Sequence, residues 1–165
     1  NKAPEAKEEV ALPNYRYVDS DSVLAAYNLA KDYNEEMLRM QTNFENTARQ
    51  RESAIQSEMN KMQQKMQNNG YLTEDSYRQD EQKLTKMQTN AQNEIAKLQN
   101  NILNAQMEAQ KTVNDSISSF IKEYNKKYGY DAILLKGATL YIDPRLDITD
   151  DVIKGLNARY NKVKK

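Results

Sequence analysis

The sequence has 165 residues, and its 24 Lys and Arg side chains balance 24 Asp and Glu, so net charge gives it no attraction for nucleic acid or an anionic membrane surface. It contains neither Cys nor His, which excludes disulfides, thiolate zinc sites and a thiol nucleophile, and removes the commonest general base and metal ligand. Only 38% of its residues are apolar, and no run approaches the ~18 apolar residues of a membrane span, so we expect an elongated fold that is mostly surface.

The N-terminal part of the chain predicts a tail, a strand and the start of a helix. Residues 1–14 mix charges, Ala and two prolines, which is typical of a flexible tail or tether. The aromatic and β-branched stretch at 15–19 predicts a strand. Asp19, Ser20 or Asp21 can cap the helix that follows.

Two long helices come next, each marked by one apolar stripe with steps of three, four or seven residues. The first stripe runs from Tyr33 to Met66 and the second from Tyr77 to Tyr124, with no Pro or Gly in either. They predict helices over residues 22–68 and 73–128. At about 1.5 Å per residue these helices would be about 70 and 84 Å long.

A tight reversal separates the two helices at residues 68–73. Asn69 and Gly70 are typical of a helix end, and we expect Gly70 to take the left-handed conformation after the cap. Thr73 is the expected N-cap of the second helix. Leu72 and Tyr77 occupy the two positions of a hydrophobic staple.

So short a link predicts an antiparallel helical hairpin. On folding back, the two stripes pair position by position: Met59 lies opposite Leu84, and the numbers of paired residues add to 142 or 143. Tyr71 is expected to lie against Met66.

The C-terminal part predicts further small elements. Lys126, Lys127 and Gly129 are typical of a helix C-terminus. Residues 132–144 contain two β-rich runs around Lys136-Gly137-Ala138, which predict a β-hairpin. Residues 147–160 predict a short capped helix with four apolar positions: Val152, Ile153, Leu156 and Tyr160.

We therefore predict an α+β fold in which a long antiparallel helical hairpin arm, residues 22–128, projects from a small β body formed by residues 15–21 and 129–165. The expected core or interface residues of this body are Val18, Leu24, Ile133, Leu135, Leu140, Ile142, Ile153 and Leu156. Three short strands and one small helix bury little apolar surface, so we expect the chain to oligomerise.

Three segments carry a resemblance to a known family over about residues 15–163. They are YRYVDSDSVLAAY at residues 15–27, the polar helical hairpin, and KKYGYDAILLKGATLYIDPRLDITDDVIKGLNARY at residues 126–160. In this order they resemble the Skp/OmpH-like periplasmic chaperones of Gram-negative bacteria. Generic coiled coils share the hairpin but lack the two flanking β segments.

The resemblance implies a homotrimer whose three hairpin arms surround a cavity. The family binds unfolded outer-membrane proteins in that cavity, uses neither ATP nor a cofactor, and has no catalytic residues to carry over. It also implies a periplasmic protein whose signal peptide has been removed. A lipid anchor on a Cys before Asn1 is an alternative that this sequence leaves open.

The charge pattern departs from these relatives, which are often strongly basic. Residues 19–128 carry 14 Lys and Arg against 16 Asp and Glu, and residues 129–165 carry 7 against 5. A positive cavity or a lipopolysaccharide site is therefore not supported, and we expect apolar contact to dominate client binding. Oppositely charged residues three apart on one helix are expected to pair: Glu58 with Lys61, and Asp80 with Lys83.

The residues around the reversal are the candidate client contacts. Met adapts to many partners, but the alternative is that the Met residues pack between the two helices. The candidates are Met59, Met62, Met66, Tyr71, Leu72 and Tyr77.

The sequence also bears on two other functions. The same long polar hairpin suits a structural coiled-coil spacer or tether of the cell envelope that binds no client. An enzyme is not expected, because neighbouring carboxylates such as Asp150 and Asp151 do not converge on one helix face and no phosphate-binding loop is present. We also expect no metal site.

Overall fold

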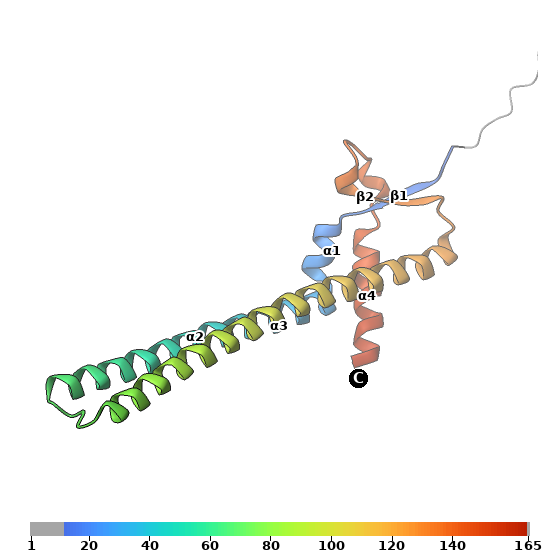
Figure 1. Cartoon of the computed structure of the whole chain (residues 1–165). Coiled ribbons are helices and arrows are strands. Elements are labelled where there is room, and N and C mark those ends of the chain that lie inside the picture. The colour runs from blue at the N-terminus through green and yellow to red at the C-terminus, as the bar shows by residue number, and fades with distance from the viewer. Residues whose placement is uncertain (1–11, 165) are drawn as a thin grey trace, which may run out of the picture. The chain divides into compact units, whose positions relative to one another are not determined.

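The computed structural model describes residues 12–164 and is mostly helical (Figure 1). The predicted strand and the two long helices are confirmed, and most of the predicted tail, residues 1–11, lies outside the described residues. The elements in chain order are β1 (Tyr15–Val18), α1 (Ser20–Ala26), α2 (Asn28–Gln67), α3 (Glu74–Tyr128), β2 (Ala132–Leu135), the 3₁₀ turns η1 (Lys136–Ala138) and η2 (Pro144–Leu146), and α4 (Thr149–Lys164).

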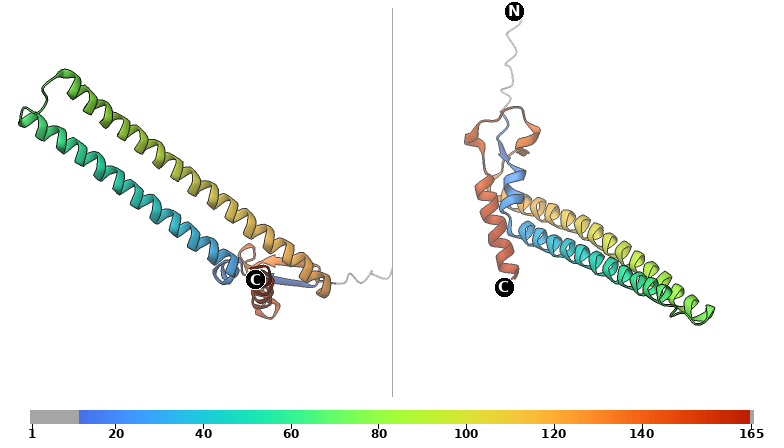
Figure 2. Two further views of the ribbon diagram at one scale, coloured as in Figure 1. Left: turned by 90° about the horizontal axis from the view of Figure 1, so that it is seen from below. Right: turned by 90° about the vertical axis from the view of Figure 1, so that its left-hand side faces the viewer.

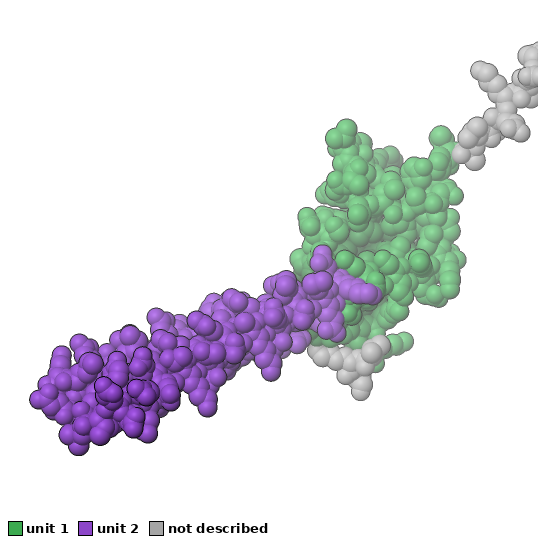
Figure 3. All heavy atoms as spheres, in the orientation of Figure 1, with its two compact units in different colours: residues 1–32, 112–165 green, residues 33–111 purple. Residues whose placement is uncertain are grey.

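The chain divides into two compact units, coloured separately in Figure 3. We call residues 33–111 the hairpin unit, and the described parts of residues 1–32 and 112–165 the terminal unit. Both boundaries fall inside the long helices α2 and α3, whereas the sequence analysis placed them near the helix ends.

The sheet of the terminal unit has two parallel strands, β1 and β2, with Tyr15 opposite Ala132 and Val18 opposite Leu135. On its other edge, β1 meets the segment before α4. There Tyr17 bridges Asp147, and the Ile148 N–H donates to the Tyr17 carbonyl at 3.0 Å. β1 is therefore flanked on both sides.

The predicted β-hairpin at residues 132–143 is wrong. After β2 the chain turns through η1, where the N–H and hydroxyl of Thr139 both donate to the Lys136 carbonyl. A tight hairpin needs residues with positive φ, and Gly137 does not supply one. Only the first of the two β-rich runs therefore joins the sheet.

A break that the sequence analysis missed separates α1 from α2 at Tyr27, whose ψ of 120° is extended. The Asn157 side chain of α4 bridges this break. Its oxygen accepts from the Asn28 N–H at 2.7 Å, and its nitrogen donates to the Ala26 carbonyl at 3.0 Å. These two bonds replace helical hydrogen bonds lost at the break, so the kink leaves those two groups paired.

The core of the terminal unit lies between α1, α4 and the sheet, and Figure 2 shows α1 beside α4. Its most deeply buried side chains are Val23, Tyr27, Val152 and Leu156. α4 also packs closely on α3, because a Cβ atom at Gly155 would lie only 2.3 Å from the Phe120 ring. A side chain at position 155 would therefore have to displace the Phe120 ring.

The end of α3 is as predicted. Gly129 has a φ of 65°, and its N–H donates to the Asn125 carbonyl at 2.8 Å, which is a left-handed C-terminal cap. The Asn125 side chain then accepts from the Tyr130 N–H and donates to the Tyr130 carbonyl, which fixes the exit of the chain toward β2.

In the hairpin unit, α2 and α3 run antiparallel, as the two views of Figure 2 agree. Three ion pairs cross between the two helices. The residue numbers of each pair add to 141 or 145, against the predicted 142 or 143, so the observed pairing of the helices is within about two residues of the predicted one. The pairs are Arg51–Glu94 at 2.7 Å, Glu58–Lys83 at 3.4 Å and Lys65–Asp80 at 2.9 Å.

Candidate functional site

The turn of the hairpin unit is closed by a Schellman motif. The Gly70 N–H donates to the Lys65 carbonyl at 2.7 Å and the Asn69 N–H to the Met66 carbonyl at 3.3 Å. The left-handed residue is Asn69, with a φ of 54°, so the prediction that Gly70 takes this conformation is wrong by one position. Gly70 serves a different need, because a Cβ atom there would lie 3.3 Å from the Lys65 carbonyl oxygen.

The start of α3 is capped as predicted. The Thr73 hydroxyl accepts from the Ser76 N–H at 3.1 Å. The predicted staple is wrong, however, since Leu72 is 91% exposed. Tyr71 takes its place and packs edge-on against Tyr77, with ring centroids 5.2 Å apart.

A polar network holds the Tyr71 side chain. Asp80 accepts from the Tyr71 hydroxyl at 2.8 Å and from the Lys65 ammonium at 2.9 Å, and the same ammonium lies 5.4 Å from the centre of the Tyr71 ring. Burial, followed by the bond to Asp80, raises the pKa of Tyr71 to about 12. Hydrogen bonds from Lys65 and then Tyr71 lower the pKa of Asp80. Tyr71 therefore stays protonated and Asp80 ionised at neutral pH, and the hydrogen bond between them holds Tyr71, in the link between the helices, against α3.

The ion pairs near the turn correct a second expectation. Glu58 does not pair with Lys61 along its helix but with Lys83 of the facing helix, and Asp80 pairs with Lys65 rather than Lys83. Glu58 is 7% exposed, so its carboxylate lies in the space between the helices. These ion pairs therefore connect α2 with α3 and do not lie along a single helix.

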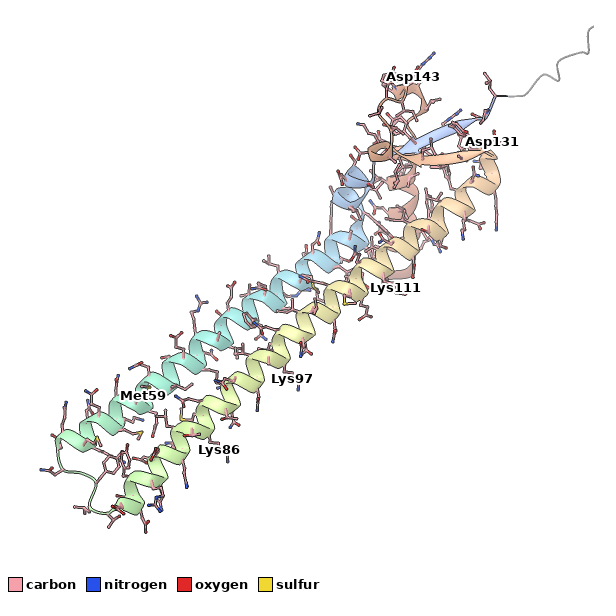
Figure 4. All side chains as sticks on the ribbon, turned by 45° about the horizontal axis from the view of Figure 1, so that its top comes forward. Met59, Lys86, Lys97, Lys111, Asp131 and Asp143 are labelled. Atoms are coloured by element: carbon pink, nitrogen blue, oxygen red, sulfur yellow. The ribbon has the colours of Figure 1, made fainter. Side chains whose placement is uncertain are left out.

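Apolar side chains gather on the outside of this fixed turn. Met66 is 60% exposed and Leu72 is 91% exposed, and with the Tyr71 and Tyr77 rings they line an open hollow of about 620 Å³. Met59, at 44% exposure, lies two helical turns before Met66 on the same face, and Figure 4 shows it on α2 close to the turn. We call Met59, Met66, Leu72, Tyr71 and Tyr77 the tip surface.

The predicted client contacts thus lie near one another around the turn, with different exposures. Tyr71, Tyr77 and Met62 are half-buried. The alternative, that the methionines pack between the helices, suits Met62 better than Met59 or Met66. Whether any of the six contacts a client stays a prediction.

The predicted body residues lie in the terminal unit and fall into three groups. Val18 and Leu156 are buried, and Ile133, Ile142 and Ile153 are half-buried. The remaining three are exposed in the single chain: Leu24 at 41%, Leu135 at 56% and Leu140 at 109%. These three are not core residues of the monomer, so a role for them in an interface stays a prediction.

Sequence reasoning missed several residues. One group is Lys65 and Asp80, which hold the Tyr71 side chain. The predicted pairing of the two helices places Lys65 close to Asp80, so this group could have been found from the sequence. The second group is three exposed apolar residues of the hairpin unit. Their only signal in the sequence is that they lie outside the apolar stripes. They are Leu38, Leu103 and Met107.

Two features are absent from the described residues, 12–164. Within this span, no helix is long and apolar enough to cross a membrane. In the same span, no three Asp or Glu side chains gather in a group that could hold a metal ion.

Comparison with known proteins places this arrangement among relatives. A family model described as outer membrane protein (OmpH-like) matches residues 14–156. The fold resembles the crystal structure of a candidate outer membrane chaperone (OmpH-like) from Caulobacter crescentus, with a TM-score of 0.78, 17% sequence identity, and coverage of 94% of this chain and 90% of the other. No curated protein matches the sequence.

Proposed function

The chain belongs to the OmpH-like family, and from this premise we propose that it is an ATP-independent holdase chaperone of the periplasm. Its clients would be unfolded outer-membrane proteins, whose apolar segments it shields from aggregation. Its partners would be these clients and further copies of itself, and it would act without catalysis.

The tip surface is the observation that carries this proposal. Met66 and Leu72 are strongly exposed and lie together at the turn, whereas Leu38, Leu103 and Met107, also exposed, lie elsewhere in the hairpin unit. An exposed apolar patch with a polar rim is typical of an interaction site, and a small patch limits self-association of the chaperone. Met is also adaptable, which suits clients without a fixed shape.

Apolar contact is the main expected source of affinity. Residues 58–86 carry five Lys and Arg and five Asp and Glu, and two pairs of them cross the hairpin, Lys65–Asp80 and Glu58–Lys83. They therefore contribute little net field to attract a charged client, and binding should change only a few-fold between low and moderate salt.

The decisive experiment measures aggregation of a urea-unfolded β-barrel outer-membrane protein after dilution, by light scattering, with the chain present in stoichiometric amounts. We expect suppression by the native chain and several-fold weaker suppression by the double variant Leu72→Ser/Met66→Gln. Leu103→Ser is the matched control, because Leu103 is also exposed, at 55%, and lies in the same unit but far along α3 from the turn. If the native chain leaves aggregation unchanged, it is not a holdase and the spacer function is favoured.

We further propose that the chain forms a homotrimer through the terminal unit. In the described part of the chain, β2 pairs with β1 alone, so its other edge is available for another strand. Leu135, the last residue of β2, and Leu140 and Tyr141 further along the chain are exposed at 56%, 109% and 81%. A second and third copy would cover these side chains.

The mass in solution tests the trimer. By sedimentation at micromolar concentration we expect three chains per particle for the native protein and for Leu103→Ser. Leu140→Ser should dissociate, because Leu140 contributes to the interface but not to the fold of the single chain. A native protein that sediments as a monomer would refute the trimer.

A further inference from the structure

The methionines of this chain are confined to one part of it. All seven, from Met37 to Met107, lie in the hairpin unit. The chain has no Cys, Trp or His, so the methionine thioethers are its most easily oxidised side chains. An oxidant that meets this protein should therefore act first on the hairpin unit.

Exposure separates these methionines into two groups. Met66 is 60% exposed, Met107 63% and Met59 44%, whereas the other four are half-buried. Met66 and Met59 belong to the tip surface, and Met66 lines the hollow beside Leu72. Met107 lies 33 residues from the start of α3, about 50 Å along the helix from the turn.

Oxidation would change the character of the tip surface without removing the structure beneath it. The Schellman turn, the Thr73 cap and the Tyr71–Asp80–Lys65 network are all formed by other atoms than the methionine sulfurs. A sulfoxide replaces an apolar thioether by a polar, strongly accepting S=O group, which water solvates well. The tip would remain folded and become polar.

We propose that Met59 and Met66 form an oxidation-sensitive modification site, and that their oxidation to sulfoxides lowers the affinity of the tip surface for unfolded clients. With hydrogen peroxide as the oxidant, the thioether sulfur attacks one peroxide oxygen, an S–O bond forms, the O–O bond breaks, and the second oxygen leaves as water after proton transfer. The sulfur is oxidised by two electrons and the peroxide is reduced. This inference rests on the proposed holdase function.

The test treats the full-length chain with hydrogen peroxide, removes the oxidant, and maps each sulfoxide by peptide mass spectrometry. Affinity for a fluorescently labelled, unfolded β-barrel protein is then measured by anisotropy, and far-ultraviolet circular dichroism checks that the helices persist. We expect Met66, Met59 and Met107 to oxidise before the four half-buried methionines. The treated native chain should bind at least about threefold more weakly than the untreated chain.

Two matched variants locate the effect. Met59→Leu/Met66→Leu keeps apolar side chains that cannot form sulfoxides, and it should retain its affinity after treatment. Met107→Leu removes an equally exposed methionine that lies away from the turn. After peroxide treatment this variant should lose affinity as the treated native chain does. Met66→Gln should lower affinity without any oxidant.

The outcomes are distinct. If the untreated chain binds but treatment changes nothing, or if the Met59→Leu/Met66→Leu variant weakens as much as the native chain, the modification site is refuted and the holdase function stands. If the untreated native chain does not bind the client at all, the holdase function fails, and the inference fails with it.

Discussion

Among the residues that the structure describes, the terminal unit buries nine apolar side chains, whereas the hairpin unit buries two, Ala91 and Ala109. The terminal unit gathers its buried residues from β1, α1, the start of α2, α3, α4 and the residues that link them. The hairpin unit instead has half-buried stripes and three ion pairs that cross between its helices.

This difference shows how one chain can combine a well-packed region with a largely solvated one. A buried side chain makes contacts on all sides, so its loss leaves a cavity. A half-buried stripe residue is partly solvated already, and the helix can relax around a smaller side chain. Stability should therefore depend on a few residues in the terminal unit and on many small contributions in the hairpin unit.

The largest effect is expected for Leu156→Ala. Leu156 is fully buried, so the substitution should destabilise the terminal unit by about 2–5 kcal/mol. Leu98→Ala is the matched control in the hairpin unit, and its half-buried side chain should cost only about 1 kcal/mol. Hydrogen exchange resolved by segment measures both, and equal losses would contradict the contrast between the units.

The next effect concerns the break between α1 and α2. Asn157→Ala leaves the Asn28 N–H and the Ala26 carbonyl without their partner, and each is part-buried, so we expect a loss of about 1–3 kcal/mol. Asn161→Ala removes only a long, exposed contact to the Asn28 side chain and should cost less than about 0.5 kcal/mol. Denaturant unfolding of both variants would reveal whether the terminal unit depends on this one side chain as well as on its core.

Local signals in the sequence were sufficient for most helix ends. Thr73 and Gly129 were correctly assigned because a cap acts within about four residues of the helix end. The residue after α2 was misassigned because Asn and Gly both tolerate the left-handed region, and only the structure shows that Gly70 is needed for its closeness to Lys65.

Long-range causes were not accessible from the sequence. The partner of Tyr15 in the sheet is Ala132, 117 residues away, and a local pattern around Lys136-Gly137-Ala138 favoured a hairpin instead. The break at Tyr27 is bridged by Asn157, about 130 residues later. Apolar periodicity also cannot separate a monomer core residue such as Leu156 from an exposed one such as Leu140.

The position of the candidate site was predictable, but the exposure of its residues was not. The hairpin register placed Met59, Met66 and Leu72 near the turn, because an antiparallel fold-back brings all residues near the link together. The exposure of Leu72 was not predictable, since Tyr71 replaces Leu72 as the side chain that packs on Tyr77.

A smaller effect tests the turn of the hairpin unit. Asn69→Val places a β-branched residue at a φ of 54° and should cost about 1–2 kcal/mol, whereas Asn69→Gly should be neutral or slightly stabilising. Both changes should act on the residues near 69 and leave the terminal unit unaffected. Segment-resolved hydrogen exchange of the two variants checks this, and faster exchange in α4 of Asn69→Val would mean that the two units do not unfold separately.

The smallest effect concerns pH, and it falls in the terminal unit. Asp143 accepts hydrogen bonds from the guanidinium and backbone N–H of Arg145, and these hold the pKa of Asp143 at about 2, below its ordinary value of 3.8. Because the folded pKa is the lower one, this contribution to stability is complete above pH 3.8 and is lost as the pH falls toward 2. The chain has no His, so stability should stay constant between about pH 5 and 8.

Titration of the side-chain carboxyl carbons by NMR should show the low pKa of Asp143, and Arg145→Gln should return it toward 3.8 without moving the pKa of Asp80 in the hairpin unit. Denaturant unfolding across the same pH range completes the measurement, and a midpoint that changes between pH 5 and 8 would contradict the prediction.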